Sequence, residues 1–107
     1  MNDTRITITV GTGLRDDGSR IKIEDRAIML IKAKMFLLTN CGGYTVTSVD
    51  GGWRDSEGTD WEEPGLMFTL LTAKGQIIPT ALASAIRDIF EQRCVMLTVE
   101  PVEAYCI

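Results

Sequence analysis

The spacing of hydrophobic residues switches between strand and helix periodicity along this chain, and the order of the switches limits its fold. Residues Arg5 to Val10 alternate between polar and apolar, which predicts a half-buried strand. Glu24 and Asp25 then suit the first turn of a helix, which should end between Asn40 and Gly43. The apolar residues of this helix recur at helical spacing: Ile28, Ile31, Met35 and Leu38.

The middle of the chain has the pattern of a hairpin. Tyr44 to Val49 predicts a second strand and Leu66 to Leu71 a third. Gly51-Gly52 indicates a bulge or a bend in between. Trp53 to Trp61 is expected to form the hairpin tip, which turns at Ser56-Glu57-Gly58 with the glycine in a left-handed conformation.

A second helix and a last strand follow. Thr80 is a plausible N-cap. The apolar stripe of the helix after it has the spacing of a helix packed on a sheet: Leu82, Ala85, Ile86, Ile89 and Phe90. Val95, Leu97 and Val99 predict the inner face of a fourth strand, whose regular pairing is expected to end at Pro101.

The resulting order, β-α-β-β-α-β, predicts an α+β fold of the ferredoxin-like type. Two crossovers joined by a hairpin give a two-layer sandwich, with an antiparallel four-stranded sheet and two helices on one face. The length of 107 residues fits a single α+β domain over residues 1–107.

Composition excludes several kinds of chemistry. The chain has no histidine, which removes Ser–His and Cys–His catalysis within one chain. Its three cysteines, Cys41, Cys94 and Cys106, have no metal-ligand spacing, so we expect reduced thiols, no metal site and no cofactor. Cys94 is expected to be buried at the start of a strand. A net charge of -4 argues against direct nucleic-acid binding.

The sequence also predicts a cytoplasmic protein without membrane contact. The first residues, Met1 to Arg5, lack the apolar stretch of a signal peptide. The longest apolar run, Ala27 to Leu38, is interrupted by Lys32 and Lys34 and is too short to cross a membrane.

The most informative segment for function runs from Asp50 to Glu63. It holds both tryptophans and six acidic residues against one basic residue, Arg54. If the predicted turn is right, Trp53 and Trp61 lie opposite each other, where they could simply stabilise an exposed hairpin. Alternatively, they form a contact surface with an acidic rim that suits a protein partner with a basic surface. Asp50 and Glu63 could also cooperate as carboxylates across the hairpin, which is a minor hypothesis.

Strand alternation predicts a second candidate surface. One side of the sheet should face the helices: Ile6, Ile8, Val10, Val46, Leu66, Phe68, Leu70, Val95, Leu97 and Val99. The opposite side is rich in threonine: Thr7, Thr9, Thr45, Thr47, Val49, Met67, Thr69, Met96 and Thr98. Its clear charges are Arg5 and Glu100, near strand ends. We expect a homodimer through this open face or a ligand over it, or else an open face that water covers.

Gly11-Thr12-Gly13 follows a strand, as nucleotide-binding loops do. The spacing of a dinucleotide-binding loop is absent, however, because its last glycine position is Asp16. Asp16-Asp17 would also repel phosphate. A structural turn is therefore expected.

The second half of the chain resembles a bacterial family of ferredoxin-like domains of unknown function. The resemblance lies in the hairpin Val49-Asp50-Gly51-Gly52-Trp53-Arg54-Asp55 with Gly58 and Glu63, followed by the strand Leu66 to Leu71 and the helix Ala81 to Arg93. It implies the ferredoxin-like fold and carries no activity with it.

These observations favour a small non-enzymatic binding module. A bacterial or phage accessory protein, including an inhibitor of a host nucleic-acid enzyme, fits the size and acidity. One alternative is a small-molecule sensor that uses the open sheet face with Trp53 and Trp61. The other is a carboxylate-based enzyme of unknown substrate.

Overall fold

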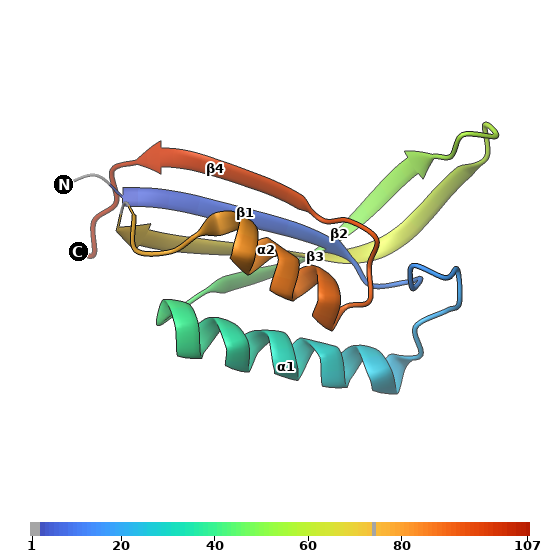
Figure 1. The fold of residues 1–107 in the computed structure, drawn as a ribbon, viewed down its shortest axis with the longest axis horizontal. Helices are drawn as coiled ribbons and strands as arrows, with labels where there is room; N and C mark the ends of the chain where they lie inside the picture. Colours follow the sequence, from blue (N-terminus) through green and yellow to red (C-terminus); the bar gives the residue numbers. More distant parts are fainter. Residues whose placement is uncertain (1–2, 74) are drawn as a thin grey trace.

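The elements of the computed structural model follow in the predicted order β-α-β-β-α-β (Figure 1). The structure describes residues 3–73 and 75–107, so the N-terminal expectation for Met1 and Asn2 lies outside the described residues. The elements are β1 (Asp3–Gly11), α1 (Ile23–Cys41), β2 (Thr45–Arg54), β3 (Asp60–Ala73), α2 (Pro79–Ile89) and β4 (Met96–Val102).

The strands form one antiparallel sheet with the order β2-β3-β1-β4. At its centre, Ile8 of β1 lies between Phe68 of β3 and Leu97 of β4. Both helices lie on the same side of this sheet, as Figure 1 shows. The prediction of a ferredoxin-like two-layer sandwich is therefore confirmed.

The core lies between the sheet and the helices and is built from alternate strand residues. Ile6, Ile8 and Phe68 are fully buried, and so are Ile86 and Phe90 from the α2 region. The rings of Phe68 and Phe90 lie 6.3 Å apart. Burial of side chains of this size stabilises the fold by roughly 1.5–3 kcal/mol each.

Helix α1 buries a different face from the one that its predicted apolar stripe would use. The buried residues are Met29, Ala33 and Leu37. The predicted stripe lies on the opposite side and is more than half exposed: Ile28, Ile31, Met35 and Leu38. The prediction was wrong because α1 carries apolar residues on two opposite faces, and spacing alone does not say which of them meets the sheet.

Two element ends also differ from the prediction. Helix α2 begins at Pro79, with Ile78 rather than Thr80 at the N-cap, because proline fits the first helical position. Strand β4 continues past the expected end, and Pro101 pairs with Thr4. An edge strand tolerates proline, whose missing N–H can face away from the sheet.

Gly51 and Gly52 do not form a bulge. The pairing of β2 with β3 runs one to one from Thr45–Thr69 to Arg54–Asp60. Strand β1 ends at Gly11, so the far part of the hairpin has no third strand beside it. This part, residues 50–63, is called the Trp arm here. It curves away from the rest of the sheet (Figure 1). Of the two predictions for Gly51-Gly52, a bulge or a bend, the structure agrees with the bend.

Candidate functional site

A hydrogen-bonded turn closes the Trp arm. The N–H of Asp55 donates to the carbonyl of Thr59 (3.0 Å), and Gly58 has a φ of 84°, which confirms the predicted three-residue loop. The carboxylate of Asp55 accepts hydrogen bonds from Trp61 Nε1 (3.0 Å) and from the N–H groups of Glu57 and Thr59. These bonds, with that from Trp61 the largest cause, hold the pKa of Asp55 below its ordinary value.

The two tryptophans lie opposite each other and stack. Their ring centroids are 5.9 Å apart and their planes differ by 16°. Trp53 is 49% exposed and Trp61 is 40% exposed. Because side chains alternate along a strand, both tryptophans lie on the same side of the Trp arm as Gly51 and Glu63. This side of the arm is continuous with the open side of the sheet. The pair is therefore a surface feature and not part of the core.

The opposite side of the Trp arm is polar. Arg54 and Asp60 form an exposed ion pair there, with 2.6 Å between Nε and Oδ1, and Arg54 lowers the pKa of Asp60. Asp50 pairs with Pro64 and shares this side. Since Glu63 points to the other side, the structure does not bring Asp50 and Glu63 together as a carboxylate pair.

Glu63 lies at the base of the Trp arm, over the end of β1. Its Oε2 accepts a hydrogen bond from the N–H of Leu14 (3.3 Å). The adjacent loop is fastened to β3 by Thr12, whose N–H and hydroxyl both donate to the carbonyl of Pro64. The carboxylate is therefore held beside the loop that follows β1.

A cleft of about 420 Å³ opens beside Glu63 and is called the arm cleft here. Three segments form its walls: the loop after β1, the Trp arm and the connection into β4. The lining residues are Gly11, Leu14, Arg15, Asp16, Gly18, Trp53, Trp61, Glu63, Gln92, Arg93 and Cys94.

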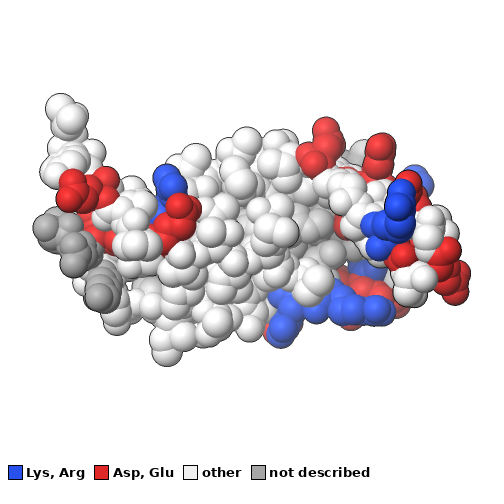
Figure 2. Space-filling view, turned by 90° about the horizontal axis from the view of Figure 1, so that it is seen from above, with Lys and Arg blue, Asp and Glu red and all other residues white. Residues whose placement is uncertain are grey.

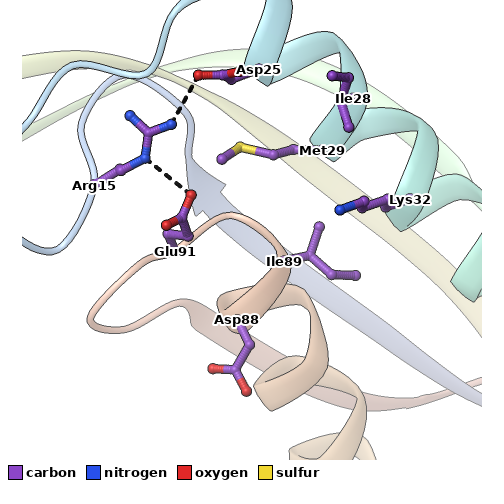
Figure 3. A pocket seen from close by; sticks show the side chains of 8 residues that line it. All are labelled: Arg15, Asp25, Ile28, Met29, Lys32, Asp88, Ile89 and Glu91. Carbon is purple, nitrogen blue, oxygen red and sulfur yellow. Dashed lines mark hydrogen bonds and ion pairs between the residues drawn. The ribbon is translucent and has the colours of Figure 1, made fainter.

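Hydrogen bonds fix one wall of the arm cleft. Arg15 donates to Asp25 and Glu91, both at 3.0 Å (Figure 3), and these contacts, with Glu91 first, raise its pKa. Gln92 Nε2 donates to the carbonyl of Leu14 (2.6 Å). Within residues 3–73 and 75–107, neither Glu63 nor Arg93 takes part in an ion pair.

The open side of the sheet is the second candidate surface. Its central row crosses all four strands and consists of threonine: Thr45, Thr69, Thr7 and Thr98. The next row is Thr47, Met67, Thr9 and Met96. At one end, Arg5 and Glu100 form an ion pair of 3.2 Å. Figure 2, seen from the side away from α1, shows charged residues toward both ends and none across the middle.

The structure divides the predicted site residues among three places. Trp53, Trp61 and Glu63 line the arm cleft, Met67 and Met96 lie on the open sheet face, and Asp50 and Arg54 lie on the polar side of the arm.

The sequence interpretation did not place Gly11, Arg93 or Cys94 in a site. The glycines of Gly11-Thr12-Gly13 could have indicated the cleft, because glycines after a strand leave room beside the backbone. Cys94 is exposed and not buried as predicted, because it precedes β4 instead of belonging to it. The alternation of side chains along β4 therefore does not determine which way Cys94 points.

The described part of the chain has neither a metal-binding cluster nor a membrane-spanning helix. Among residues 3–73 and 75–107, no group of three or more histidine, cysteine, aspartate or glutamate residues could hold a metal ion. Neither α1 nor α2 is long and apolar enough to cross a bilayer.

Comparisons with known proteins support the fold class. No protein-family model and no curated protein matches the sequence. A phage SAM lyase in complex with S-methyl-5′-thioadenosine has a similar structure, with a TM-score of 0.61 and 17% identity over 95% of this chain and 90% of the lyase. CutA from Synechococcus elongatus gives a TM-score of 0.62 and 12% identity, over 92% of this chain and 75% of CutA.

A third similar structure is the periplasmic divalent cation tolerance protein CutA from Archaeoglobus fulgidus. Its TM-score is 0.59 and its identity is 9%, over 99% of this chain and 88% of that protein. At these identities the likeness concerns the fold, which is the ferredoxin-like α+β class.

Proposed function

We propose that this chain is a small-molecule binding module whose ligand, a nucleoside or a close derivative, lies in the arm cleft. One observation carries the proposal: the arm cleft is lined both by a stacked tryptophan pair and by the carboxylate of Glu63. Within residues 3–73 and 75–107, this carboxylate has no ion-pair partner. Its volume of about 420 Å³ lies within the usual range for small-molecule sites.

The tryptophan pair suits the flat part of such a ligand. Stacking of a nucleobase on an aromatic side chain contributes roughly 1–3 kcal/mol per base. Trp53 and Trp61 are stacked on each other, and Asp55 fixes the indole of Trp61 by a hydrogen bond. A rigid aromatic wall loses little conformational entropy when a ligand binds.

Glu63 suits the sugar. A carboxylate has about four acceptor positions, and the N–H of Leu14 is the one donor to Glu63 within residues 3–73 and 75–107. The remaining positions can accept hydrogen bonds from two neighbouring hydroxyl groups, as acidic residues do with ribose in dinucleotide-binding folds. Gly18, which also lines the cleft, brings no side chain into it.

The similar phage SAM lyase supports this choice of ligand class. It shares the fold over 95% of this chain and its structure contains S-methyl-5′-thioadenosine. The roles proposed for Trp53, Trp61 and Glu63 come from their positions in this chain, because an identity of 17% transfers no residue roles.

Tryptophan fluorescence tests the proposal directly. Titration with adenosine or S-methyl-5′-thioadenosine should quench the emission saturably. 2′,3′-Dideoxyadenosine, which lacks both hydroxyls, should bind about tenfold or more weakly, as should adenosine to Glu63→Gln. Glu62→Gln is the matched control, since Glu62 lies on the other side of the same strand and should leave binding unchanged.

Equal binding of adenosine and the dideoxy compound would contradict the role given to Glu63. No saturable quenching by either adenosine compound would contradict the nucleoside proposal. Analysis of the titrated samples for conversion of the ligand would distinguish a binding protein from an enzyme.

A second candidate function, self-association through the open sheet face, is favoured by the absence of charge at its centre. Thr7, Thr69 and Met67 lie in the middle of this face, and the ion pair of Arg5 with Glu100 lies at one end. Exposed apolar surface can mark an interaction site, and Met67 and Met96 supply such surface on this face. A homodimer through this face, and a partner with a basic surface on the acidic Trp arm, are both part of this interaction hypothesis.

Light scattering after size exclusion tests the second candidate. Wild-type protein should have the mass of a dimer, and Met67→Lys should produce a folded monomer because it places a charge in the interface. Ser48→Lys is the control, since Ser48 is exposed on the other side of β2. A monomeric wild type, or a Met67→Lys variant that stays dimeric, would contradict this function.

A further inference from the structure

Gln92 lines the arm cleft with a side-chain amide whose orientation is fixed. Its Nε2 atom donates hydrogen bonds to two backbone carbonyls, that of Leu14 at 2.6 Å and that of Phe90 at 2.9 Å. A carbonyl oxygen accepts a hydrogen bond only from a donor, so the nitrogen of the amide must occupy this position and not its oxygen. The two bonds use both hydrogens of the amide group.

The other end of this amide, Oε1, is an acceptor that the described part of the chain does not use. Among residues 3–73 and 75–107, no side chain and no backbone N–H donates a hydrogen bond to it. In the same residues, no buried side-chain oxygen or nitrogen lacks a partner. Oε1 is therefore not buried. Because Gln92 lines the arm cleft, a ligand in this cleft can reach its free acceptor.

The backbone around Gln92 is held at several points. Glu91, which precedes it, has a left-handed φ of 52°, an uncommon conformation for a residue other than glycine. The carboxylate of Glu91 pairs with Arg15 (Figure 3), and its carbonyl accepts a hydrogen bond from the N–H of Asp16 at 2.8 Å. The N–H of Gln92 itself donates to the carbonyl of Arg87 at 3.0 Å. An acceptor held in this way loses little conformational entropy when a ligand binds.

Leu14 lies between Gln92 and Glu63 and is hydrogen-bonded to both. Its N–H donates to Glu63 Oε2 at 3.3 Å, and its carbonyl accepts from Gln92 Nε2 at 2.6 Å. Since both side chains contact the same residue, these two side-chain atoms lie within about 10 Å of each other. A nucleoside can bridge a span of this length. With its sugar at Glu63, the edge of its base comes within reach of Gln92.

We propose that Gln92 determines the base specificity of the arm cleft and selects a base with an amino group on its edge, as adenine has. This inference rests on the proposed binding of a nucleoside. The amino group of adenine is a donor that matches the acceptor Oε1. Guanine carries a carbonyl oxygen at the same position of its ring, which would place two acceptors against each other. Such a mismatch lowers the affinity for the wrong ligand.

The carboxylate of Asp16 is another acceptor in the lining of the arm cleft. Asp16 is exposed, whereas Gln92 is half-buried. A hydrogen bond in a less solvated position is stronger, because fewer water molecules compete for it. We therefore assign the amino group of the base to Gln92, and separate substitutions of the two residues distinguish them.

A comparison of adenosine with purine riboside, which lacks the amino group, tests this inference. In calorimetric titrations, the wild type should bind adenosine about fivefold or more tightly, a ratio typical of one hydrogen bond. Gln92→Met should bind the two compounds equally. The ratio of the two affinities is the readout, since loss of the bond to Leu14 would weaken both compounds alike. Gln76→Met, between β3 and α2, is the matched control and should keep the wild-type ratio.

Equal affinities in the wild type, with adenosine still bound, would overturn the role of Gln92 and leave the nucleoside proposal standing. A preference for adenosine that persists in Gln92→Met, or that is lost in Asp16→Ala instead, would also overturn it. Glu63→Gln should weaken both compounds and keep their ratio, because Glu63 is assigned to the sugar. If adenosine did not bind at all, the nucleoside proposal would be contradicted and this inference with it.

Discussion

The carboxylate of Glu63 occupies the space that a side chain on Gly11 would need. A Cβ atom on Gly11 would lie 2.6 Å from Glu63 Oε1, closer than any normal contact. The glycine at the end of β1 therefore allows Glu63 to reach the loop at Leu14, to which it is hydrogen-bonded. The absence of a side chain at Gly11 therefore determines where the Glu63 carboxylate lies in the arm cleft.

Gly11→Ala should weaken nucleoside binding without unfolding the protein. The new methyl group meets the end of a flexible side chain, which can move aside, so the free energy of unfolding should change by about 1 kcal/mol or less. The displaced carboxylate should lower the affinity for adenosine as Glu63→Gln does. Denaturant unfolding and the fluorescence titration check the two effects separately. Full adenosine affinity in Gly11→Ala would argue against the placement of Glu63.

Gly65→Ala should instead destabilise the fold. A Cβ atom there would lie 2.8 Å from the backbone carbonyl oxygen of Val10, and the sheet must shift to admit it. Overpacking of this kind costs about 1–3 kcal/mol. Gly43→Ala is the control, since a Cβ atom at Gly43 meets no atom within 4 Å. Equal stability of the two variants in denaturant would contradict the close approach of β1 and β3.

The neighbouring residues Leu37 and Leu38 test which face of α1 is buried. Leu37 is fully buried and Leu38 is 53% exposed. Leu37→Ala should therefore lower the free energy of unfolding by about 2–5 kcal/mol, and Leu38→Ala by less than about 1 kcal/mol. If urea unfolding gave the larger loss for Leu38→Ala, the core would use the stripe that the sequence pattern indicates.

The tip of the Trp arm should loosen in acid. The pKa of Asp55 is below its ordinary value, chiefly because of the hydrogen bond from Trp61. A carboxylate with a lowered pKa contributes stability above the pKa of the unfolded chain, about 3.9, and loses it as pH falls through the folded value. The circular dichroism of the stacked indoles should therefore weaken below about pH 4. The Asp55→Asn variant should show no such weakening. If its circular dichroism changed with pH as that of the wild type does, Asp55 would not be the group responsible.

Strand alternation and the hairpin turn were predictable because both are local. Gly58 and the pairing of Trp53 with Trp61 follow from the turn, and the buried face of the sheet follows from Ile6, Ile8 and Phe68. The buried face of α1 was not predictable, because the stripe with Ile31 and the stripe with Ala33 are both apolar. Tertiary packing determines which stripe meets the sheet, and the spacing of apolar residues carries no information about it.

The candidate site was predictable only in part. Both tryptophans and Glu63 stand out within an acidic hairpin, so the sequence identified one wall of the arm cleft. The other walls come from Gly11 and Arg93, which are far from the hairpin in sequence and meet it only through the β1–β3 pairing and the connection into β4. A single sequence does not show contacts of this kind.

A nucleoside bound between the Trp arm and the loop after β1 would contact residues from both segments. Amide and indole resonances of the labelled protein, recorded by NMR during an adenosine titration, test it most directly. A nucleoside in the arm cleft should produce concerted shifts of the Trp53 and Trp61 indole N–H signals and of the Gly11 and Leu14 amides, with the Thr69 amide at the centre of the sheet unchanged. Shifts confined to residues outside the arm cleft, or none at saturating adenosine, would contradict it.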